Sequence, residues 1–455
     1  MQKLVWDQAL IEKYNYSGPR YTSYPTALEF DERFNYQDLI KATHTYPERP
    51  LSLYIHIPFC HKLCYFCGCN KTITRHQEKA DKYLDYLEKE IQIQAPYFQH
   101  RQVSQLHWGG GTPTFLLPHQ ITRLMAMLRK AFTFKANAEL SIEVDPREIE
   151  LSTIDHLANE GFNRLSLGVQ DFNKAVQKAV NREQDEAFIE KLLTRAREQG
   201  FQSTNLDMIY GLPLQTKASF ANTLKQVLAL DPARLSIFNY AHMPTLFAAQ
   251  RKINEDDMPA PAEKLAMLQY TIEFLTQSGY QFIGMDHFAK PTDELAVAQQ
   301  QGVLHRNFQG YTTQEDADLL GMGVSAISQI GHSYSQNQKK LSTYYSQIEE
   351  MGHAQWRGVS LNEDDLIRRE VIKKLICNFK LDIKQIEQQF SLNFSDYFAE
   401  DIKLLQCFID DQLVNIDDHE IAVAPKGRLL IRNICMCFDV YLRNKVRQQQ
   451  FSRVI

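Results

Sequence analysis

The sequence predicts an α/β fold, in which a curved sheet of parallel strands carries helices on its outside and a mainly helical domain follows. Short apolar runs alternate with amphipathic stretches between about residues 51 and 290, and such alternation builds parallel sheet. Chemically capable side chains follow the ends of several of these runs. From about residue 362 the pattern turns helical. We therefore expect an N-terminal arm over 1–35, a barrel domain over 36–355 and a helical C-terminal domain over 356–455.

Seven apolar runs are the expected strands. They cover residues 51–57, 105–108, 139–144, 163–169, 204–209, 234–240 and 280–285. Each is followed by a stretch with helical periodicity, such as the one after Arg75 that spaces Tyr83, Leu87 and Ile91 along one face. The carboxyl ends of the strands of a parallel barrel lie on one rim, where such folds place their active sites. The side chains expected at this rim are Cys60, the turn 109–113, Glu143, Gln170, Asp207 and Ala241.

The C-terminal domain should contain helices and one hairpin. Leu366, Val371 and Leu375 mark one amphipathic helix, a second is expected over 383–390, and residues 413–423 should form a β-hairpin. Helices followed by a hairpin are typical of winged-helix domains that bind DNA. The aspartates in and before the hairpin argue against contact with phosphate, so a cover over the barrel mouth or a structural cap is expected instead.

Composition indicates a cytoplasmic enzyme. The 455 residues carry a formal net charge of -5, which supplies no general attraction for nucleic acid or an anionic membrane. No apolar run has the length of a membrane span, and the N-terminus lacks a secretory signal. An anionic substrate must then be met by local arginines. Buried free thiols are expected at Cys377, Cys407, Cys435 and Cys437, which lie among apolar residues of expected helices.

Four further cysteines lie within ten residues. Cys60, Cys64 and Cys67 have C-x3-C-x2-C spacing, and Cys69 follows them. Such a triplet ligates three corners of a cubane iron-sulfur cluster and leaves the fourth iron open to a substrate. Zinc is a weaker alternative, because its cysteine ligands usually come as two separated pairs. A disulfide framework is not favoured, because such frameworks suit short secreted chains. Thiols without a metal are not favoured either, because thiolates this close would repel or oxidise.

The triplet resembles that of the radical S-adenosylmethionine (SAM) enzymes. In those enzymes the open iron takes the amino and carboxylate groups of SAM, and electron transfer splits the sulfonium to release a 5'-deoxyadenosyl radical. The glycine turn 109–113 lacks the spacing of a dinucleotide or Walker loop, but its backbone can approach a ligand closely. Beside the cysteines, a site for the amino group of SAM is favoured over a plain tight turn. Glu143 could meet a cationic group or a ribose, with a solvated strand-end carboxylate as the alternative.

Several segments together resemble the oxygen-independent coproporphyrinogen III oxidases of heme synthesis, over nearly the whole chain. The segments are residues 19–26 (PRYTSYPT), 54–60 (YIHIPFC), 67–70 (CGCN), 110–112 (GGT), 306–311 (RNFQGY) and 318–323 (DLLGMG). The resemblance implies a radical SAM partial TIM-like barrel. It also implies a 4Fe-4S cluster held by Cys60, Cys64 and Cys67.

The same resemblance implies sites for two SAM molecules. The residues implied around the SAM on the cluster are Tyr54, Gly110, Glu143, Ala241 and Ile327. Those implied around a second SAM are Phe66, Gly111, Thr112, Gln170, Arg182 and Asp207. Cys69, Tyr54 and Glu143 are the residues expected to take part in catalysis.

The implied reaction is oxidative decarboxylation. A primary carbon radical can remove hydrogen from a propionate β-carbon, after which loss of carbon dioxide and one electron leaves a vinyl group. Two propionates of coproporphyrinogen III would be converted to give protoporphyrinogen IX. The reaction requires a reducing electron donor, and the enzyme is expected to be a monomer. Arg20, Phe308 and Gln309 are the expected substrate residues, because the substrate carries several carboxylates. An arginine that only packs the arm is the alternative for Arg20.

Cys69 and the N-terminal arm distinguish this reading from a heme-binding chaperone on the same scaffold. Members of that group usually lack the fourth cysteine and the arm, so Cys69 and residues 19–26 favour the oxidase. A radical SAM enzyme acting on another tetrapyrrole is a more distant alternative. Only Gly68 separates Cys69 from Cys67, so a fourth ligand there would strain the loop. Cys69 is expected to donate a hydrogen atom or proton or to position substrate, with a small apolar filler as the alternative.

Overall fold

The structure is a computed structural model that describes residues 4–315 and 317–443. Its contacts divide the chain into two compact units. The barrel unit comprises residues 30–268 and 316–360, and the terminal unit comprises 1–29, 269–315 and 361–455. Residues 269–315, which the sequence places in the barrel domain, thus group with both ends of the chain. The chain passes between the units within α9 (Pro261–Gln277).

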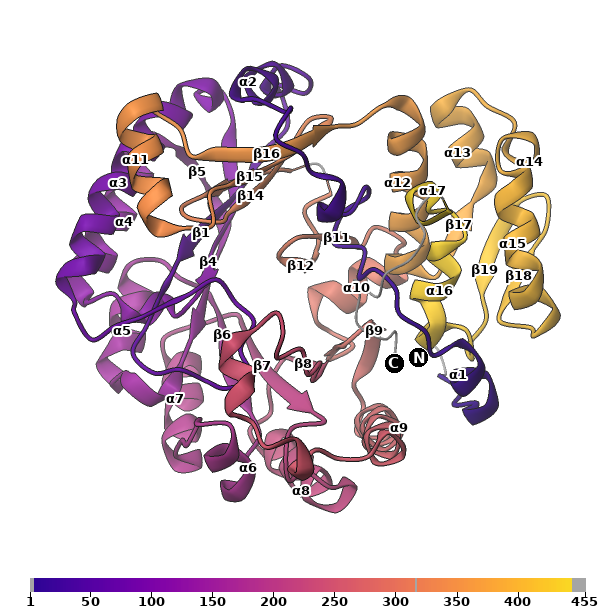
Figure 1. Ribbon diagram of the computed structural model, residues 1–455, viewed down its shortest axis with the longest axis horizontal. Helices are drawn as coiled ribbons and strands as arrows, with labels where there is room; N and C mark the ends of the chain where they lie inside the picture. The colour runs from indigo at the N-terminus through magenta and orange to yellow at the C-terminus, as the bar shows by residue number, and fades with distance from the viewer. Residues whose placement is uncertain (1–3, 316, 444–455) are drawn as a thin grey trace. The chain divides into compact units, whose positions relative to one another are not determined.

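The barrel unit is built on a curved sheet whose strands follow the order β16-β15-β14-β13-β1-β4-β5-β6-β7-β8 (Figure 1). The pairs from β13 through β1 to β8 are parallel. Six of the expected strands are confirmed here: β1 (Leu51–Ile57), β4 (Gln102–Gly110), β5 (Thr133–Val144), β6 (Arg164–Gln170), β7 (Ser203–Tyr210) and β8 (Arg234–Asn239).

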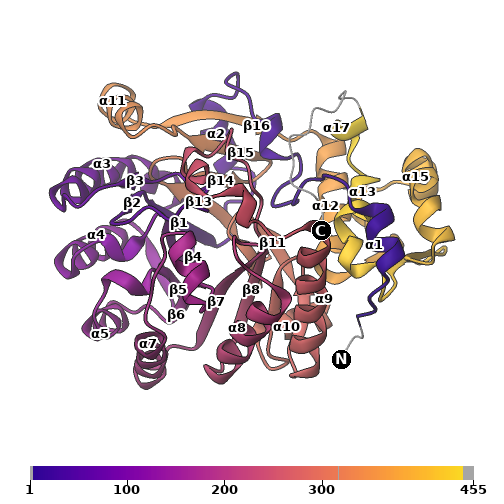
Figure 2. The ribbon, with the colours of Figure 1, turned by 60° about the horizontal axis from the view of Figure 1, so that its bottom comes forward.

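Helices cover the outer face of this sheet (Figures 1 and 2). They are α3 (Glu78–Gln94), α4 (Pro118–Ala131), α5 (Leu151–Asn159), α6 (Lys174–Ala179), α7 (Glu186–Glu198) and α8 (Lys217–Ala229). In α3 the residues spaced for one face, including Tyr83 and Leu87, are fully buried. Strand β1 alternates fully buried Leu53 and Ile55 with polar Ser52 and Tyr54. Because successive side chains of a strand point to opposite faces, the apolar set packs on the helices and the polar set lines the inside.

Four strands of the sheet were not expected. They are β13 (Asp318–Met322), β14 (Ile327–Ile330), β15 (Ser333–Asn337) and β16 (Gln355–Ser360), with α11 (Leu341–Met351) between the last two. Strands β13 to β16 form an antiparallel extension beside β1. All four are short, and β15 has the polar sequence SYSQN although it is buried, so it carries no apolar periodicity.

The expected strand-helix rhythm is wrong at its last step. Strand β9 (Gln281–Gly284) exists, but β10 (His287–Ala289) follows it as an antiparallel partner, not a helix. Gly284 and Met285 have φ angles of 147° and 54°, and this left-handed backbone makes the tight turn between the strands.

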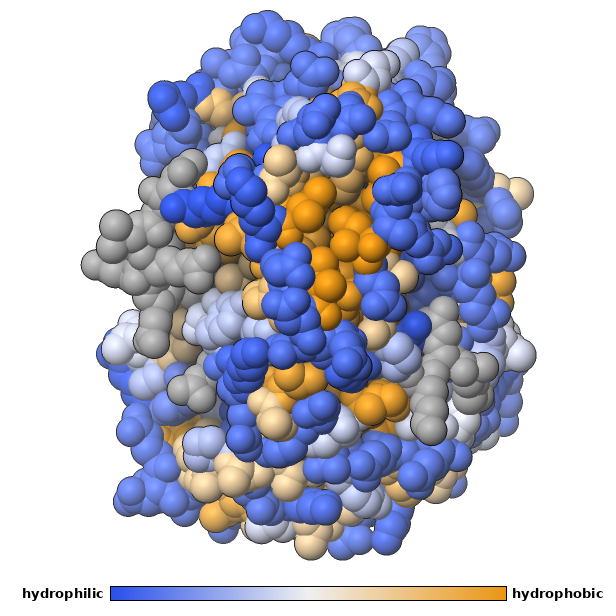
Figure 3. Space-filling view, turned by 90° about the vertical axis from the view of Figure 1, so that its right-hand side faces the viewer, coloured by the Kyte–Doolittle hydropathy of each residue, from blue (hydrophilic) through white to orange (hydrophobic). Residues whose placement is uncertain are grey.

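The terminal unit confirms the expected helices and hairpin. Its elements include α12 (Glu363–Asn378), α13 (Ile383–Phe390), α14 (Phe394–Tyr397), α15 (Ala399–Asp410), α16 (Ile431–Met436) and α17 (Val440–Arg443). Strands β18 (Val414–Ile416) and β19 (Glu420–Val423) form the hairpin, and β17 (Lys380–Asp382) pairs with β19. The face shown in Figure 3 has a central group of apolar side chains surrounded by hydrophilic ones.

Three of the four cysteines of the terminal unit are buried as expected: Cys377, Cys435 and Cys437. The expectation for Cys407 is wrong, because its thiol is exposed. It lies one turn after Leu404 in α15, and that leucine is itself 46% exposed, so this face of the helix points to solvent.

The N-terminal arm packs on the last helices of its own unit. Tyr21 donates a hydrogen bond to Asp439 at 2.9 Å, and the ring of Tyr14 stacks on Phe408. The Arg432 guanidinium donates to the backbone carbonyl of Pro19 at 2.9 Å. These contacts fix the arm that carries Arg20. In the described part of the chain, no helix has the length and apolar character of a membrane span.

Candidate active site

The cysteine loop begins directly after β1. Two short strands, β2 (Phe59–Cys60) and β3 (Thr72–Ile73), pair in parallel and close a loop that carries the other three cysteines. The amide of Thr72 donates to Pro58 at 2.6 Å, and that of Thr74 donates to Cys60 at 3.0 Å. The loop is therefore anchored at the carboxyl end of a barrel strand, as the sequence predicts.

The thiols of this loop differ in their surroundings. Cys60 and Cys64 are buried, Cys67 is half-buried and Cys69 is exposed, and all eight cysteines of the chain are free. Burial raises the pKa of Cys60 to about 12, although the Thr112 hydroxyl donates to its sulfur at 3.3 Å. A hydrogen bond from the Cys69 thiol, helped by the charge of Lys71, lowers the pKa of Cys67 to about 6. Among the described residues no three His, Cys, Asp or Glu side chains are gathered as ligands of a single metal ion.

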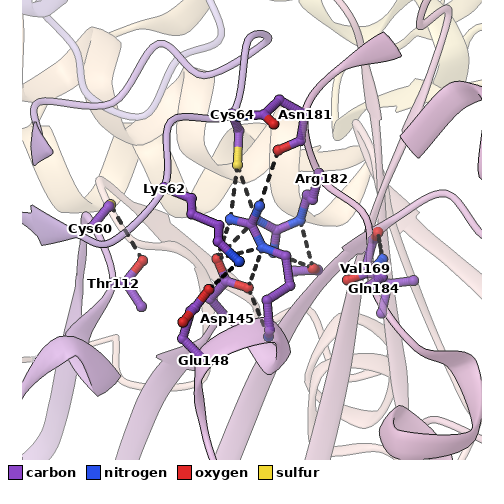
Figure 4. A network of polar contacts seen from close by, with 12 residues as sticks. Cys60, Lys62, Cys64, Thr112, Asp145, Glu148, Val169, Asn181, Arg182 and Gln184 are labelled. Carbon is purple, nitrogen blue, oxygen red and sulfur yellow. Dashed lines mark hydrogen bonds and ion pairs between the residues drawn. The ribbon is translucent and has the colours of Figure 1, made fainter. Parts of the chain in front are cut away.

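Two buried arginines contact the Cys64 sulfur (Figure 4). Arg147 and Arg182 each donate to it at 3.2 Å, and both also donate to Asp145. Burial alone would raise the pKa of Asp145, but the charges of Arg182 and Arg147 outweigh it and hold the pKa well below its usual range. Figure 4 also shows the ion pair between Lys62 and Glu148, at 2.5 Å, which ties the loop to the same segment.

The glycine turn after β4 packs directly on the cysteine loop. Amides of Gly111 and Thr112 donate to the carbonyls of Ile57 and Phe59, each at 2.8 Å. A Cβ on Gly111 would lie 2.8 Å from backbone atoms of Pro58 and Phe59. Gly110 has a φ of 114°, which side chains rarely adopt. Close packing therefore accounts for these two glycines, and a ligand at the turn is a separate proposal.

Glu143 is the last but one residue of β5 and lies on the inside of the sheet. One carboxylate oxygen accepts from the Gly110 amide at 3.2 Å and the other lies 3.4 Å from His107 Nε2. Burial alone would raise the pKa of Glu143, but the contacts with His107 and Gly110 outweigh it and lower the pKa. His107 Nδ1 is 2.6 Å from the Ser141 hydroxyl, and the ring of Tyr54 stacks on His107. The Glu143 side chain is 43% exposed, so an ionised carboxylate is accessible at this point.

Gln170, Arg182 and Asp207 lie on neighbouring strands or just beyond them. A Cβ on Gly168 would be 2.8 Å from Arg182 and 2.9 Å from Gln170, so these two side chains flank Gly168. Asp207 accepts hydrogen bonds from Ser166 at 3.0 Å and from Asn205 at 2.8 Å. Burial, reinforced by the negative charge of Glu143, raises the pKa of Asp207 to about 6.

Three further expected residues also lie in the barrel unit: Phe66, Ala241 and Ile327. Gln250 donates to the carbonyls of Phe66, at 3.0 Å, and Ala241, at 3.3 Å, and so joins the cysteine loop to the end of β8. Gly321 pairs with Tyr54 across β13 and β1, and the backbone of Ile327 packs against Gly321.

The expected substrate residues lie in the terminal unit. Arg20 forms an ion pair with Asp286. Phe308 and Gln309 form the tip of a hairpin between β11 (His305–Asn307) and β12 (Gly310–Thr312). Within residues 4–315 and 317–443, the buried Nε2 of Gln309 and the buried Nε and Nη1 of Arg306 have no hydrogen-bond partner.

Sequence reasoning missed Arg147 and His107. His107 is a polar residue on the inner side of an apolar strand, and that position in the sequence could have identified it as a candidate site residue. Arg147 follows the end of β5 by three residues, and no spacing marks it as a partner of Cys64.

Comparison with known proteins identifies the family of the chain. Residues 54–227 match the radical SAM superfamily, and residues 361–430 match the HemN C-terminal domain. Oxygen-independent coproporphyrinogen III oxidase of Escherichia coli (strain K12) is 69% identical, with all of both chains covered. The enzyme of that name from Pseudomonas aeruginosa is 50% identical over the full length of both. The solved E. coli coproporphyrinogen III oxidase (HemN), described as a radical SAM enzyme, superposes with a TM-score of 0.94 at 68% identity, covering 97% of this chain and 100% of that one.

A curved parallel sheet with a C-x3-C-x2-C loop at the end of its first barrel strand, together with the superfamily match, defines a radical SAM enzyme. Full-length sequence identity to several proteins of one name then identifies the family within this class. The chain belongs to the family of oxygen-independent coproporphyrinogen III oxidases. The predicted fold class and the family resemblance are confirmed.

Proposed function

We propose that this chain oxidises coproporphyrinogen III without oxygen, converting two propionate side chains to vinyl groups with loss of carbon dioxide to give protoporphyrinogen IX for heme synthesis. The observation that carries the proposal is the cysteine loop, in a chain 69% identical along its full length to an enzyme of that name. The free thiols and the absence of disulfides suit a reducing compartment, and we propose the cytoplasm. We further propose that the enzyme is a monomer and that it receives electrons from a one-electron donor.

The residues on the loop fit a 4Fe-4S cluster. Cys60, Cys64 and Cys67 are free thiols, and the sulfurs of Cys60 and Cys64 accept hydrogen bonds from neighbouring donors, as thiolate ligands do. When bound, the cluster and SAM would supply a radical that removes hydrogen from a propionate β-carbon. We propose these three cysteines as the cluster ligands.

Glu143 and its neighbours are proposed to orient SAM. An ionised carboxylate held by Gly110 can accept hydrogen bonds from an ammonium group or a ribose. Tyr54 stacks beside it on His107, and Ala241 and Ile327 are proposed as the remaining contacts. For a second SAM molecule we propose Phe66, Gly111, Thr112, Gln170, Arg182 and Asp207. The adjacency of Gln170 and Arg182 at Gly168 supports part of that set.

Arg20, Phe308 and Gln309 are proposed to bind the porphyrinogen. The amide nitrogen of Gln309 and two guanidinium nitrogens of Arg306 are buried hydrogen-bond donors with no partner in the described part of the chain, as a site for a carboxylate requires. Asp286 now pairs with Arg20, so a substrate carboxylate would compete with it for the guanidinium.

Cys69 is proposed to act in catalysis without ligating the cluster. Its thiol is exposed and adjoins Cys67, so it can reach a bound molecule beside the cluster ligands. A hydrogen atom or a proton could be donated from that position.

The test is an anaerobic assay of the reconstituted protein with coproporphyrinogen III, SAM and dithionite. Protoporphyrinogen IX should form, together with 5'-deoxyadenosine, and the Cys67→Ala variant should form neither and retain little iron. Tight heme binding without decarboxylation by the iron-loaded protein would contradict the proposal and favour a heme chaperone.

A further inference from the structure

The three proposed cluster ligands are not equivalent, because Cys64 alone contacts two arginines among the described side chains. Arg147 Nη2 and Arg182 Nη1 each lie 3.2 Å from its sulfur, and their side chains are only 4% and 8% exposed. Cys60 instead accepts from the neutral hydroxyl of Thr112 at 3.3 Å. Two guanidinium donors thus converge on Cys64, whereas the cationic neighbour of Cys67 is the single ammonium group of Lys71.

The two guanidinium groups are held rigidly in place. Asp145 accepts from both, at 2.6 Å from Arg147 Nη2 and 3.2 Å from Arg182 Nη1. Arg147 also donates to the carbonyl of Asn181 at 3.1 Å, and Arg182 Nε donates to the carbonyl of Gly168 at 3.1 Å. Two buried cations and one carboxylate leave a net charge of +1 beside Cys64.

Such a charge must affect the reduction of a cluster bound there. A one-electron donor adds one negative charge to the cluster, and a buried positive charge stabilises the reduced state more than the oxidised state. Hydrogen bonds to a ligating sulfur act in the same direction, because they withdraw charge from it. Removal of either effect should make reduction harder.

We propose that Arg147, acting with Arg182 through the sulfur of Cys64, raises the reduction potential of the cluster and so assists its one-electron reduction. The inference rests on the proposed function in taking Cys64 as a ligand. Arg147 therefore acts on the reduction potential through the sulfur of Cys64 and does not contact the substrate. The competing explanation is that Arg147 only anchors the cysteine loop, which would affect iron content but not potential.

The experiment measures the midpoint potential of the reconstituted cluster, without SAM or porphyrinogen, by redox titration followed through its paramagnetic signal. Arg147→Met should retain iron and shift the potential to more negative values, and Arg147→Lys, which keeps the charge, should shift it less. Asp145→Asn removes an anion and should shift the potential in the opposite direction. Arg195→Met, at a partly exposed arginine of α7 paired with Asp155, is the matched control and should leave it unchanged.

An iron-loaded Arg147→Met protein with the unaltered potential would overturn the inference, as would shifts of the same sign in Arg147→Met and Asp145→Asn. Should Arg147→Met fail to hold a cluster, the Asp145→Asn shift decides, and an unchanged or more negative potential refutes the inference. Neither result bears on the proposed function, which fails instead when the unaltered, iron-loaded protein forms no protoporphyrinogen.

Discussion

The carboxylate of Glu143 accepts a hydrogen bond from the backbone amide of Gly110 at 3.2 Å, which links the end of β5 to the glycine turn after β4. Because the neighbouring amides of that turn are bonded to the backbone around Cys60, the position of this carboxylate is coupled to the cysteine loop.

Glu143→Ala should weaken SAM binding roughly tenfold or more, since hydrogen bonds to a charged group contribute about 1.5–3 kcal/mol. Iron content should stay at the level of the unaltered protein. Equilibrium binding of SAM to the reconstituted protein measures the effect, with exposed Glu183→Ala as control. Equal affinity in the two variants would remove Glu143 from the SAM site.

Cys69→Ser should keep its iron and bind SAM, yet lose most decarboxylation, because its thiol adjoins Cys67 and is proposed to act without ligating the cluster. Iron content, the change in the reduced cluster's spectrum on adding SAM, and product formation are measured in one preparation. Cys407→Ser, the other exposed cysteine, should behave as the unaltered protein. Iron loss as severe as in Cys67→Ala would identify Cys69 as a ligand, and full activity would exclude its thiol from the chemistry.

Arg20→Ala should impair porphyrinogen turnover more than it impairs SAM cleavage in the absence of porphyrinogen. The reason is that its guanidinium is proposed to meet a substrate carboxylate, whereas the proposed SAM contacts lie in the barrel unit. Both rates are compared with those of Arg33→Ala, whose side chain is 91% exposed. An equal loss of the two rates would point to a folding role through Asp286.

Asp207 should make the fold less stable as pH rises. Its folded pKa of about 6 lies above the ordinary 3.8, so the folded state holds the proton more tightly and loses stability between pH 4 and about pH 6. A shift of about two pKa units corresponds to about 3 kcal/mol. Asp207→Asn should therefore raise the free energy of unfolding at pH 8 by up to that amount, with the gain vanishing near pH 4. Denaturant unfolding at the two pH values, with exposed Asp256→Asn as control, tests this, and a gain of equal size at both would contradict it.

The parallel strands could be predicted because their two faces differ chemically. Strand β1 alternates buried Leu53 and Ile55 with inward Ser52 and Tyr54, and that alternation is written in the sequence. Strand β15 could not be predicted, because its polar residues are buried through pairing with β14 and β16. Tertiary context, not local preference, makes it a strand.

The residues of the site likewise divide into those that the sequence predicts and those that it does not. Cys60 follows β1, Glu143 lies near the end of β5 and Asp207 lies within β7, so topology alone brings them to parallel strands of one sheet. The contact of Arg147 with Cys64 depends on the reach of a long side chain between segments 83 residues apart. No periodicity encodes a contact of that kind, and the structure was needed to find it.

Hydrogen removal from the propionate is the central step of the proposed reaction, and isotope transfer tests it most directly. Coproporphyrinogen III labelled with deuterium at the propionate β-carbons would be incubated anaerobically with the iron-loaded protein, SAM and dithionite. Protoporphyrinogen IX should form together with 5'-deoxyadenosine that carries deuterium in its methyl group. Product formed alongside unlabelled 5'-deoxyadenosine, or without any 5'-deoxyadenosine, would contradict it.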